Sequence, residues 1–334
     1  MTTLTDLDSV QDRVGKLGGA RDLKVIDFID EHAARWLGAT SLCFLAIGKA
    51  GELGTTMVGD EPGFLSVNDS KVLDLPLAAF DEPELAIEGR PYGALFLVPG
   101  MNETLRINGT VYRLNDSSVT LYVEECYLHC AKALLRSDFW QAELRGDVSV
   151  EPSALIDQVR FLSLATIGSE GPADVSPKGD PADTLLKEIG GTLCFADRPG
   201  NRRIDSFRNI LEEPQVSVLG LVPGFSSFLQ IHGTAALSTE ESLLSEFTVQ
   251  GKAPNLVTKI SPEFVRVKES AALKRAELWP VSEAPQELKG ADIFKAHMKL
   301  SKEKGLGASV ARTLVSVPGL LRRALDSDYD KNMY

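Results

Sequence analysis

The chain has 334 residues, of which 43% are hydrophobic and 25% charged, the proportions of an ordinary globular protein with room for about two domains. Its formal net charge of -12 argues against nucleic-acid binding, which needs a basic surface. The sequence has no apolar run of membrane-spanning length, too few cysteines for a disulfide framework and no signal-peptide pattern at its start, so we expect a cytoplasmic protein.

The first half of the chain reads as a series of short strands framed by two helices. Apolar residues at helical spacing predict a helix over 22–37, and a shorter helix is predicted over 130–140. Between them, compact or alternating apolar runs predict strands at 41–47, 51–58, 64–75 (a hairpin), 94–98, 104–112 and 119–128. This pattern favours a small β-barrel over a parallel sheet.

The same order of features returns in the second half of the chain. Three matching pairs of segments show this: 41–48 with 161–168, 97–100 with 221–224, and 133–140 with 272–279. The offset grows from 120 to 139 residues along the chain, while the order of the segments is kept. Ordered recurrence of this kind indicates a tandem duplication.

The duplication divides the chain into three predicted parts. They are a first repeat with its N-terminal helix over 1–145, a second repeat over 146–280, and a C-terminal helical extension over 281–334. One interpretation of 310–325 in the extension is an amphipathic membrane helix. The acidity of the chain and the Pro318-Gly319 break favour packing across the barrels or over the site, so we expect no membrane contact.

An arginine-rich segment in the second repeat predicts an anion site. Residues 198–208 contain four arginines, and Pro199-Gly200 reads as a turn before a helix with Asn201 as its N-cap. Cations in the first turn of a helix oppose its dipole, so we expect a bound anion, most simply a phosphate. The alternative interpretation is a solvated basic helix start.

Each repeat has kept a different half of a polar site. The second repeat carries the arginine segment with Ser176 and Lys178, whereas the first has an acidic segment between residues 74 and 91. In the later half of each repeat, it is the first repeat that has kept the polar residues. Five of them are replaced in the second repeat: Glu103 by Ser227, Arg106 by Gln230, His129 by Lys268, Cys130 by Glu269 and Lys132 by Ala271. If the two barrels pair around a ligand, one composite site is intact and the other has decayed.

These residues resemble the pyridoxamine 5'-phosphate oxidase-like, FMN-binding split-barrel superfamily. One branch of this superfamily has the motif Ser-Pro-x-Gly-Asp-Pro, here at 176–181, and the motif Asp-Arg-Pro-Gly-Asn-Arg-Arg, here at 197–203. Two further motifs of the branch, which belong to the late part of the barrel, are found here in the first repeat at 103–109 and 127–134. The resemblance covers about 20–280 as two copies. It implies a mainly β protein with flanking helices (α+β), built as two fused split β-barrels that form a pseudo-dimer, present as a monomer or a homodimer.

The resemblance also implies which residues bind the cofactor, FMN. Arg202 and Arg203 would hold the flavin phosphate, supported by Arg198 and Asn201. Ser176 and Lys178 would lie near the isoalloxazine ring. From the other barrel, the residues that would face the flavin or the substrate are Arg106, His129 and Lys132.

Two of these residues are the candidate catalytic groups. Lys178 could stabilise negative charge on a reduced flavin, and His129 could contact the substrate or the flavin. The alternatives are a surface turn lysine and a satisfied interface histidine. Cys126 and Cys130 do not indicate a metal site, because the remaining histidines are scattered through the sequence.

The predicted function is that of an FMN-dependent oxidoreductase. It would transfer a hydride or electrons between the flavin and a small organic substrate, with O2 or NAD(P)H as the other partner. One alternative is a reductase that uses a deazaflavin, and another is a flavin-binding or storage protein without turnover.

Overall fold

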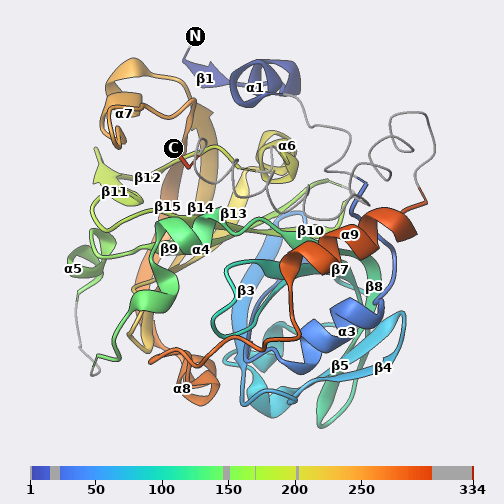
Figure 1. Ribbon diagram of the computed structural model, residues 1–334. Helices are drawn as coiled ribbons and strands as arrows, with labels where there is room; N and C mark the ends of the chain where they lie inside the picture. Colours follow the sequence, from blue (N-terminus) through green and yellow to red (C-terminus); the bar gives the residue numbers. More distant parts are fainter. Residues whose placement is uncertain (1, 16–22, 146–150, 170, 201–202, 303–332) are drawn as a thin grey trace.

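The computed structural model describes residues 2–15, 23–145, 151–169, 171–200, 203–302 and 333–334. Two antiparallel sheets dominate these residues (Figure 1). The first sheet contains β2 (Leu42–Lys49), β3 (Glu52–Gly59), β4 (Ser66–Asp69), β5 (Val72–Pro76), β6 (Pro91–Leu97), β7 (Thr104–Leu114) and β8 (Ser118–His129). The second contains β9 (Phe161–Ile167), β10 (Ala173–Gly179), β11 (Leu186–Ile189), β12 (Thr192–Ala196), β13 (Gln215–Leu221), β14 (Ser227–Ser238) and β15 (Val257–Glu269).

The two sheets have the same topology. The first runs β3-β2-β6-β7-β8-β5-β4 and the second β10-β9-β13-β14-β15-β12-β11, so each strand has a counterpart seven places later. The predicted fold class is confirmed: the protein is mainly β, with two split barrels and flanking helices. The helices, all short, are α1 (Leu7–Val14), α3 (Glu31–Gly38), α4 (Lys132–Arg136), α5 (Pro152–Ile156), α6 (Asp205–Glu212), α7 (Glu241–Ser245), α8 (Ala271–Ala276) and α9 (Gly290–Leu300).

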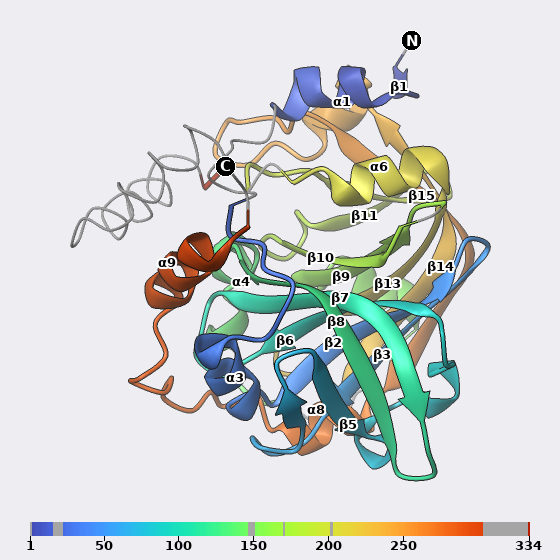
Figure 2. The same ribbon diagram turned by 90° about the vertical axis from the view of Figure 1, so that its right-hand side faces the viewer.

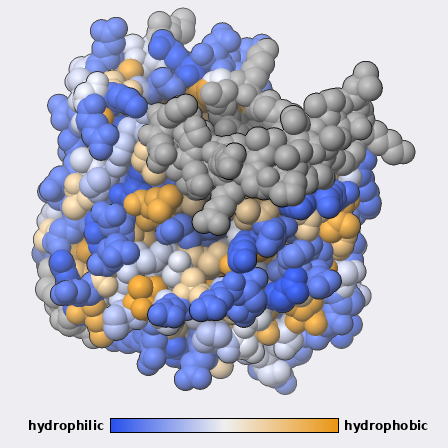
Figure 3. All heavy atoms as spheres, in the orientation of Figure 1, coloured by the Kyte–Doolittle hydropathy of each residue, from blue (hydrophilic) through white to orange (hydrophobic). Residues whose placement is uncertain are grey.

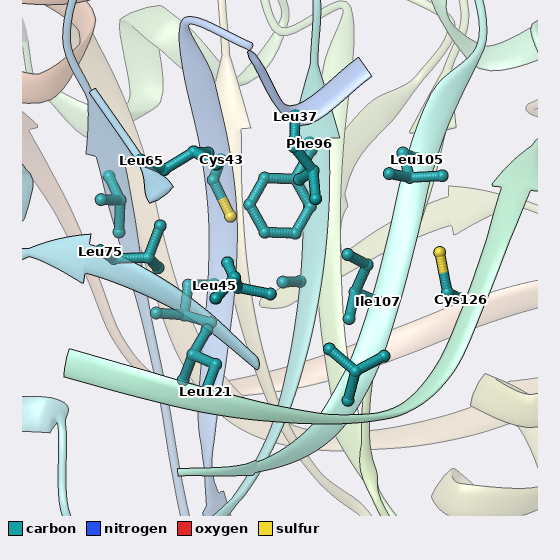
Figure 4. Packing of buried hydrophobic residues seen from close by; sticks show 14 of the residues in the cluster. Leu37, Cys43, Leu45, Leu65, Leu75, Phe96, Leu105, Ile107, Leu121 and Cys126 are labelled. Atoms are coloured by element: carbon teal, nitrogen blue, oxygen red, sulfur yellow. The ribbon is translucent and has the colours of Figure 1, made fainter. Parts of the chain in front are cut away.

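Strand β2 is buried on both faces, which explains its unbroken apolar sequence. Cys43, Leu45 and Ile47 point into the core of the first barrel, part of which is shown in Figure 4. The alternate residues of the strand, Leu42, Phe44 and Ala46, belong to a separate cluster between the barrels.

The side chains of β9 point to two clusters in the same way. Leu162 and Leu164 lie in the core of the second barrel, and Phe161 lies in the cluster between the barrels. There the Phe161 ring stacks on the Phe44 ring, with centroids 5.4 Å apart. The two barrels therefore share a continuous apolar interface along their central strands.

Matching close contacts tie each barrel to the helix that follows the other. A Cβ on Gly179 would overlap the carbonyl oxygen of Ala133 in α4, and a Cβ on Gly59 would lie 2.7 Å from the carbonyl oxygen of Ala272 in α8. Both positions therefore need glycine.

The arginines of the two helices repeat this symmetry. Arg136 donates from Nε to the carbonyl of Gly179 at 2.9 Å, and Arg275 donates from Nε to the carbonyl of Gly59 at 3.0 Å. These paired contacts show a pseudo-two-fold relation between the repeats.

The terminal segments cross between the barrels. Strand β1 (Thr3–Leu4) pairs with β14, and Val10 of α1 is buried in the core of the second barrel, although we assigned this segment to the first repeat. Helix α9 of the C-terminal extension packs instead on α3 and β8 of the first barrel (Figure 2). The three-part division of the chain stays a prediction.

Two predicted helix starts are wrong. The helix predicted from residue 22 begins at Glu31, because the Asp30 side chain accepts a hydrogen bond from the Ala33 amide and caps it. The helix predicted with Asn201 as its N-cap begins instead at Asp205. Arg203 therefore precedes the helix and does not lie in its first turn. The predicted helix over 310–325 lies outside the described residues.

The surface seen in Figure 3 is mainly hydrophilic, and its apolar side chains lie in small separate groups. In the part of the chain that the structure describes, no helix is long and apolar enough to cross a membrane.

Candidate functional site

A cavity of about 260 Å³ lies between the two repeats and is lined by both. Strand β10, which forms one wall, runs between α6 and β7 (Figure 2). The first repeat contributes the residues Arg106, His129, Cys130, Lys132, Ala133 and Arg136. The second contributes polar residues of β10 and of the segment between β12 and α6, among them Ser176, Lys178, Asp197, Arg198, Arg203 and Asp205.

The cavity brings together the predicted site residues from both halves of the chain. Those that line it are Arg106, His129, Lys132, Ser176, Lys178, Arg198 and Arg203. Asn201 and Arg202 lie outside the described residues. The geometry thus joins the late half of the first repeat to the early half of the second, while the role of each residue stays a prediction.

One end of the cavity has two guanidinium groups on a single carboxylate. Arg198 donates from Nε to Oδ2 of Asp180 at 2.6 Å, and Nε of Arg136 lies 3.3 Å from Oδ1 of Asp180. Burial raises the pKa of Asp180, while the two arginines act in the opposite direction. The Arg198 Nη2 is buried and has no hydrogen-bond partner among the described residues. This end therefore combines excess positive charge with an unused donor, which suits an anion.

The middle of the cavity is fixed by a buried ion pair between the repeats. Arg106 of β7, 1% exposed, pairs with Asp174 of β10 and also donates from Nε to Oδ1 of Asn108 at 3.1 Å. Asp174 in turn accepts a hydrogen bond from the Ser176 hydroxyl at 2.8 Å. Because every group has a partner, the network fixes how β7 and β10 face each other.

Lys178 projects from the same strand into the cavity. Its Nζ lies 3.4 Å from Oδ1 of Asp197 and 5.1 Å from the centroid of the Phe207 ring. The side chain is 15% exposed, so the ammonium group is only partly hydrated. A cation held in this way can interact with a ligand that enters the cavity.

His129 ends β8 at the opposite wall and is partly buried. Burial lowers the pKa of its imidazole well below the usual 6.5, and the nearby charges of Lys24, Arg106, Arg203 and Lys178 lower it further. The ring is therefore neutral at physiological pH. A neutral imidazole can donate from one nitrogen and accept at the other.

A second cavity of about 400 Å³ adjoins the first. Arg203 and Asp205 line both cavities, and Arg203 donates from Nε to Oδ2 of Asp205 at 2.7 Å. The other polar residues of the second cavity include Asn108, Glu125, Asp174, Arg208, Asn209 and Glu212. The ion pair between Arg203 and Asp205 therefore lies where the two cavities meet.

Sequence reasoning missed the carboxylates that hold the cationic side chains. Asp174, Asp180 and Asp205 each pair with an arginine of the cavity. Their position within or beside the predicted motifs was the available signal. Glu103, one of the residues kept only in the first repeat, does not line the cavity, because its side chain lies against Gly290 at the start of α9.

The pseudo-symmetric location is filled by the protein's own carboxylates. Glu82 pairs with Lys268, the counterpart of His129, and accepts a hydrogen bond from Gln230, the counterpart of Arg106, at 3.4 Å. Asp81 accepts hydrogen bonds from the Ser270 hydroxyl and the Ala272 amide. Acidic groups of the first repeat therefore lie where the second repeat has its arginines.

Comparison with known proteins supports the predicted resemblance. Residues 151–269 match the family described as pyridoxamine 5'-phosphate oxidase. No curated protein matches the chain.

Among solved structures, HupZ from Group A Streptococcus is 16% identical and the match covers 37% of this chain and 98% of that one, with a TM-score of 0.30. General Stress Protein 26 from Bacillus anthracis is 17% identical over 34% and 88% of the two chains, with a TM-score of 0.28. An F420 reductase is 16% identical over 36% and 98%, also with a TM-score of 0.28. Likenesses of this size say nothing about ligand or activity.

Proposed function

We propose that this chain, whose residues 151–269 match the family described as pyridoxamine 5'-phosphate oxidase, binds FMN in the cavity between its repeats and acts as an oxidoreductase on a small organic molecule. The observation that carries the proposal is the composition of that cavity. Among its described lining residues, lysine and arginine side chains from both repeats outnumber carboxylates, and the cofactor residues implied by the motifs lie there together.

The phosphate group of FMN fits the end of the cavity near Arg198. There one carboxylate, Asp180, serves two guanidinium groups, and the Arg198 Nη2 is a buried donor without a partner among the described residues. A phosphate dianion would supply both the missing charge and the missing acceptors. Arg203 lines the same cavity, and we assign it to the same phosphate.

The remaining groups fit the flavin ring and its chemistry. When bound, FMN would supply the hydride and electron transfer. Lys178 would hold a positive charge beside the ring, and the neutral His129 would donate or accept a hydrogen bond. The adjoining cavity supplies polar space for a small substrate, with O2 or NAD(P)H as the other partner.

The chain holds both walls of the cavity, so a pseudo-dimeric monomer suffices for binding. The direct test is to measure FMN binding by absorbance and then to add NADH or NADPH without oxygen. Retained FMN that is bleached by either nucleotide, and reoxidised by air or a substrate, would support the proposal.

Other outcomes of this experiment distinguish the alternatives. A preference for a deazaflavin over FMN would change the cofactor but not the site. Bound FMN that no donor or substrate turns over would indicate a storage protein. A chain that binds neither cofactor would contradict the proposal.

A further inference from the structure

The Tyr127 ring lies at the centre of three cationic side chains. The Cζ atom of Arg203 is 4.5 Å from the ring centroid, the Nζ of Lys24 is 5.5 Å away, and the Cζ of Arg106 is 5.7 Å away. All three distances are within the range of cation–π attraction. The cations come from three separate parts of the chain, and Arg203 comes from the other repeat.

Each of these cations is also held by a polar partner. Arg203 donates to Asp205, Arg106 pairs with Asp174, and Lys24 donates to the backbone carbonyl of Leu128 at 2.5 Å. Three positive charges around one site repel each other, and an electron-rich group between them adds to the stabilisation that these partners give. The face of the aromatic ring is such a group.

The ring of Tyr127, and not its hydroxyl, makes these contacts. The side chain is fully buried, and its hydroxyl has no hydrogen-bond partner in the part of the chain that the structure describes. A buried hydroxyl without a partner is a cost to stability. Phenylalanine should therefore replace Tyr127 without loss of the cation–π contacts.

The matching positions of the second repeat lack this arrangement. In the first repeat Arg106 pairs in register with Tyr127, and in the second its counterpart Gln230 pairs with Arg266. In the second repeat an arginine thus takes the place of the aromatic residue, and a neutral glutamine takes the place of Arg106. An aromatic residue is present at this position only beside the cavity that has kept its other polar residues.

We propose that Tyr127 is a positioning residue, whose ring holds Arg203 against the cavity wall so that its guanidinium meets the phosphate of the cofactor. This inference rests on the proposed function. In this arrangement a residue of the first repeat, Tyr127, orients an arginine of the second repeat, Arg203. The effect acts on the phosphate end of the ligand and not on its ring system.

The test compares FMN with riboflavin, which has the same ring system but no phosphate. We expect Tyr127→Phe to bind both with wild-type affinity. Tyr127→Leu should bind FMN about tenfold more weakly and leave riboflavin affinity unchanged, because a cation–π contact at a buried site is lost. Circular dichroism and thermal unfolding would establish that each variant is folded, with Tyr127→Met as a second non-aromatic variant should the leucine variant not fold.

The outcomes separate this inference from the function on which it rests. A non-aromatic variant that keeps wild-type FMN affinity would overturn it. So would an equal loss of FMN and riboflavin, since that would show a structural role alone. Wild-type protein that binds neither compound would overturn the proposed function, and this inference with it.

Discussion

Glu82 of the first repeat forms an ion pair with Lys268 of the second, the residue that takes the place of His129. The pair joins the repeats at the location where the pseudo-symmetry would put a second cofactor. A carboxylate repels a phosphate, and the pairing with Lys268 removes the attraction that this cation would otherwise offer.

We therefore expect about one FMN per chain at saturation, since only one of the two pseudo-symmetric locations suits an anion. Absorbance of bound flavin against protein concentration from amino-acid analysis would measure the ratio. A ratio near two would show that the Glu82 side also binds the cofactor.

Replacing Arg203 by alanine should weaken FMN binding by about 10- to 100-fold, the usual size of a lost hydrogen bond to a charged group. Isothermal titration or fluorescence quenching of FMN would measure this. Arg113→Ala is the control, because Arg113 contacts the exposed Tyr112 ring and neither residue lines the cavity. Equal effects of the two substitutions would contradict a specific role for Arg203.

The buried pair between Arg106 and Asp174 should show strong coupling in stability. Asp174→Ala leaves the Arg106 guanidinium buried without its carboxylate, which should lower the free energy of unfolding by about 3–5 kcal/mol. The double variant Arg106→Met with Asp174→Ala should be more stable than Asp174→Ala alone. Urea unfolding of the single and double variants completes the cycle, and additive losses would refute the coupling.

The neutral state of His129 should make stability depend on pH. Its pKa is lower in the folded chain than in the unfolded chain, so the unfolded state binds more protons below pH 6.5. The contribution of His129 is therefore complete above this pH and declines as the pH falls, by at most about 1.4 kcal/mol per pH unit.

Urea unfolding at pH 7.5 and 5.5 would test this by comparing wild type with His129→Gln. The variant should lose less stability on acidification than wild type. His232→Gln serves as the matched control, since His232 lies beside Glu263 outside the cavity between the repeats. If the two substitutions have the same effect on the pH dependence, the neutral state of His129 is not its cause.

Tyr334 should slow the loss of cofactor. Its ring lies 5.6 Å from the Cζ of Arg198, and Arg136 donates to the carbonyl of Met333 at 2.9 Å, so these two residues cover the arginines at the anion end. Tyr334→Ala should raise the FMN dissociation rate by about three- to tenfold. Stopped-flow dilution would measure the rate, with Tyr112→Ala as control, and an unchanged rate would exclude this role.

The duplication and the candidate site residues could be predicted because both depend on patterns that are local in the sequence. Apolar runs such as 42–47 and 161–167 recur with their flanking turns, and the strands that they predict form at these positions. The complementary losses between the repeats predicted that Arg106 and Ser176 would share a site, and both residues line the cavity between the repeats.

The parts that could not be predicted depend on contacts between distant segments. The location of α1 on the second barrel follows from the burial of Val10, which its local sequence does not encode. The start of α6 at Asp205 was missed because Asn201 is the better N-cap by residue type. The role of Tyr127 was invisible, since nothing near it in the sequence shows that Arg203 lies over its ring.

The two walls of the cavity belong to one covalent chain, and this changes how occupancy responds to dilution. In a dimer of separate barrels, a shared site disappears when the subunits dissociate, so cofactor retention varies with protein concentration. Here the linked repeats keep a high effective concentration of each wall for the other. Saturation of the cavity should then follow the concentration of free cofactor alone, even where the protein itself is scarce.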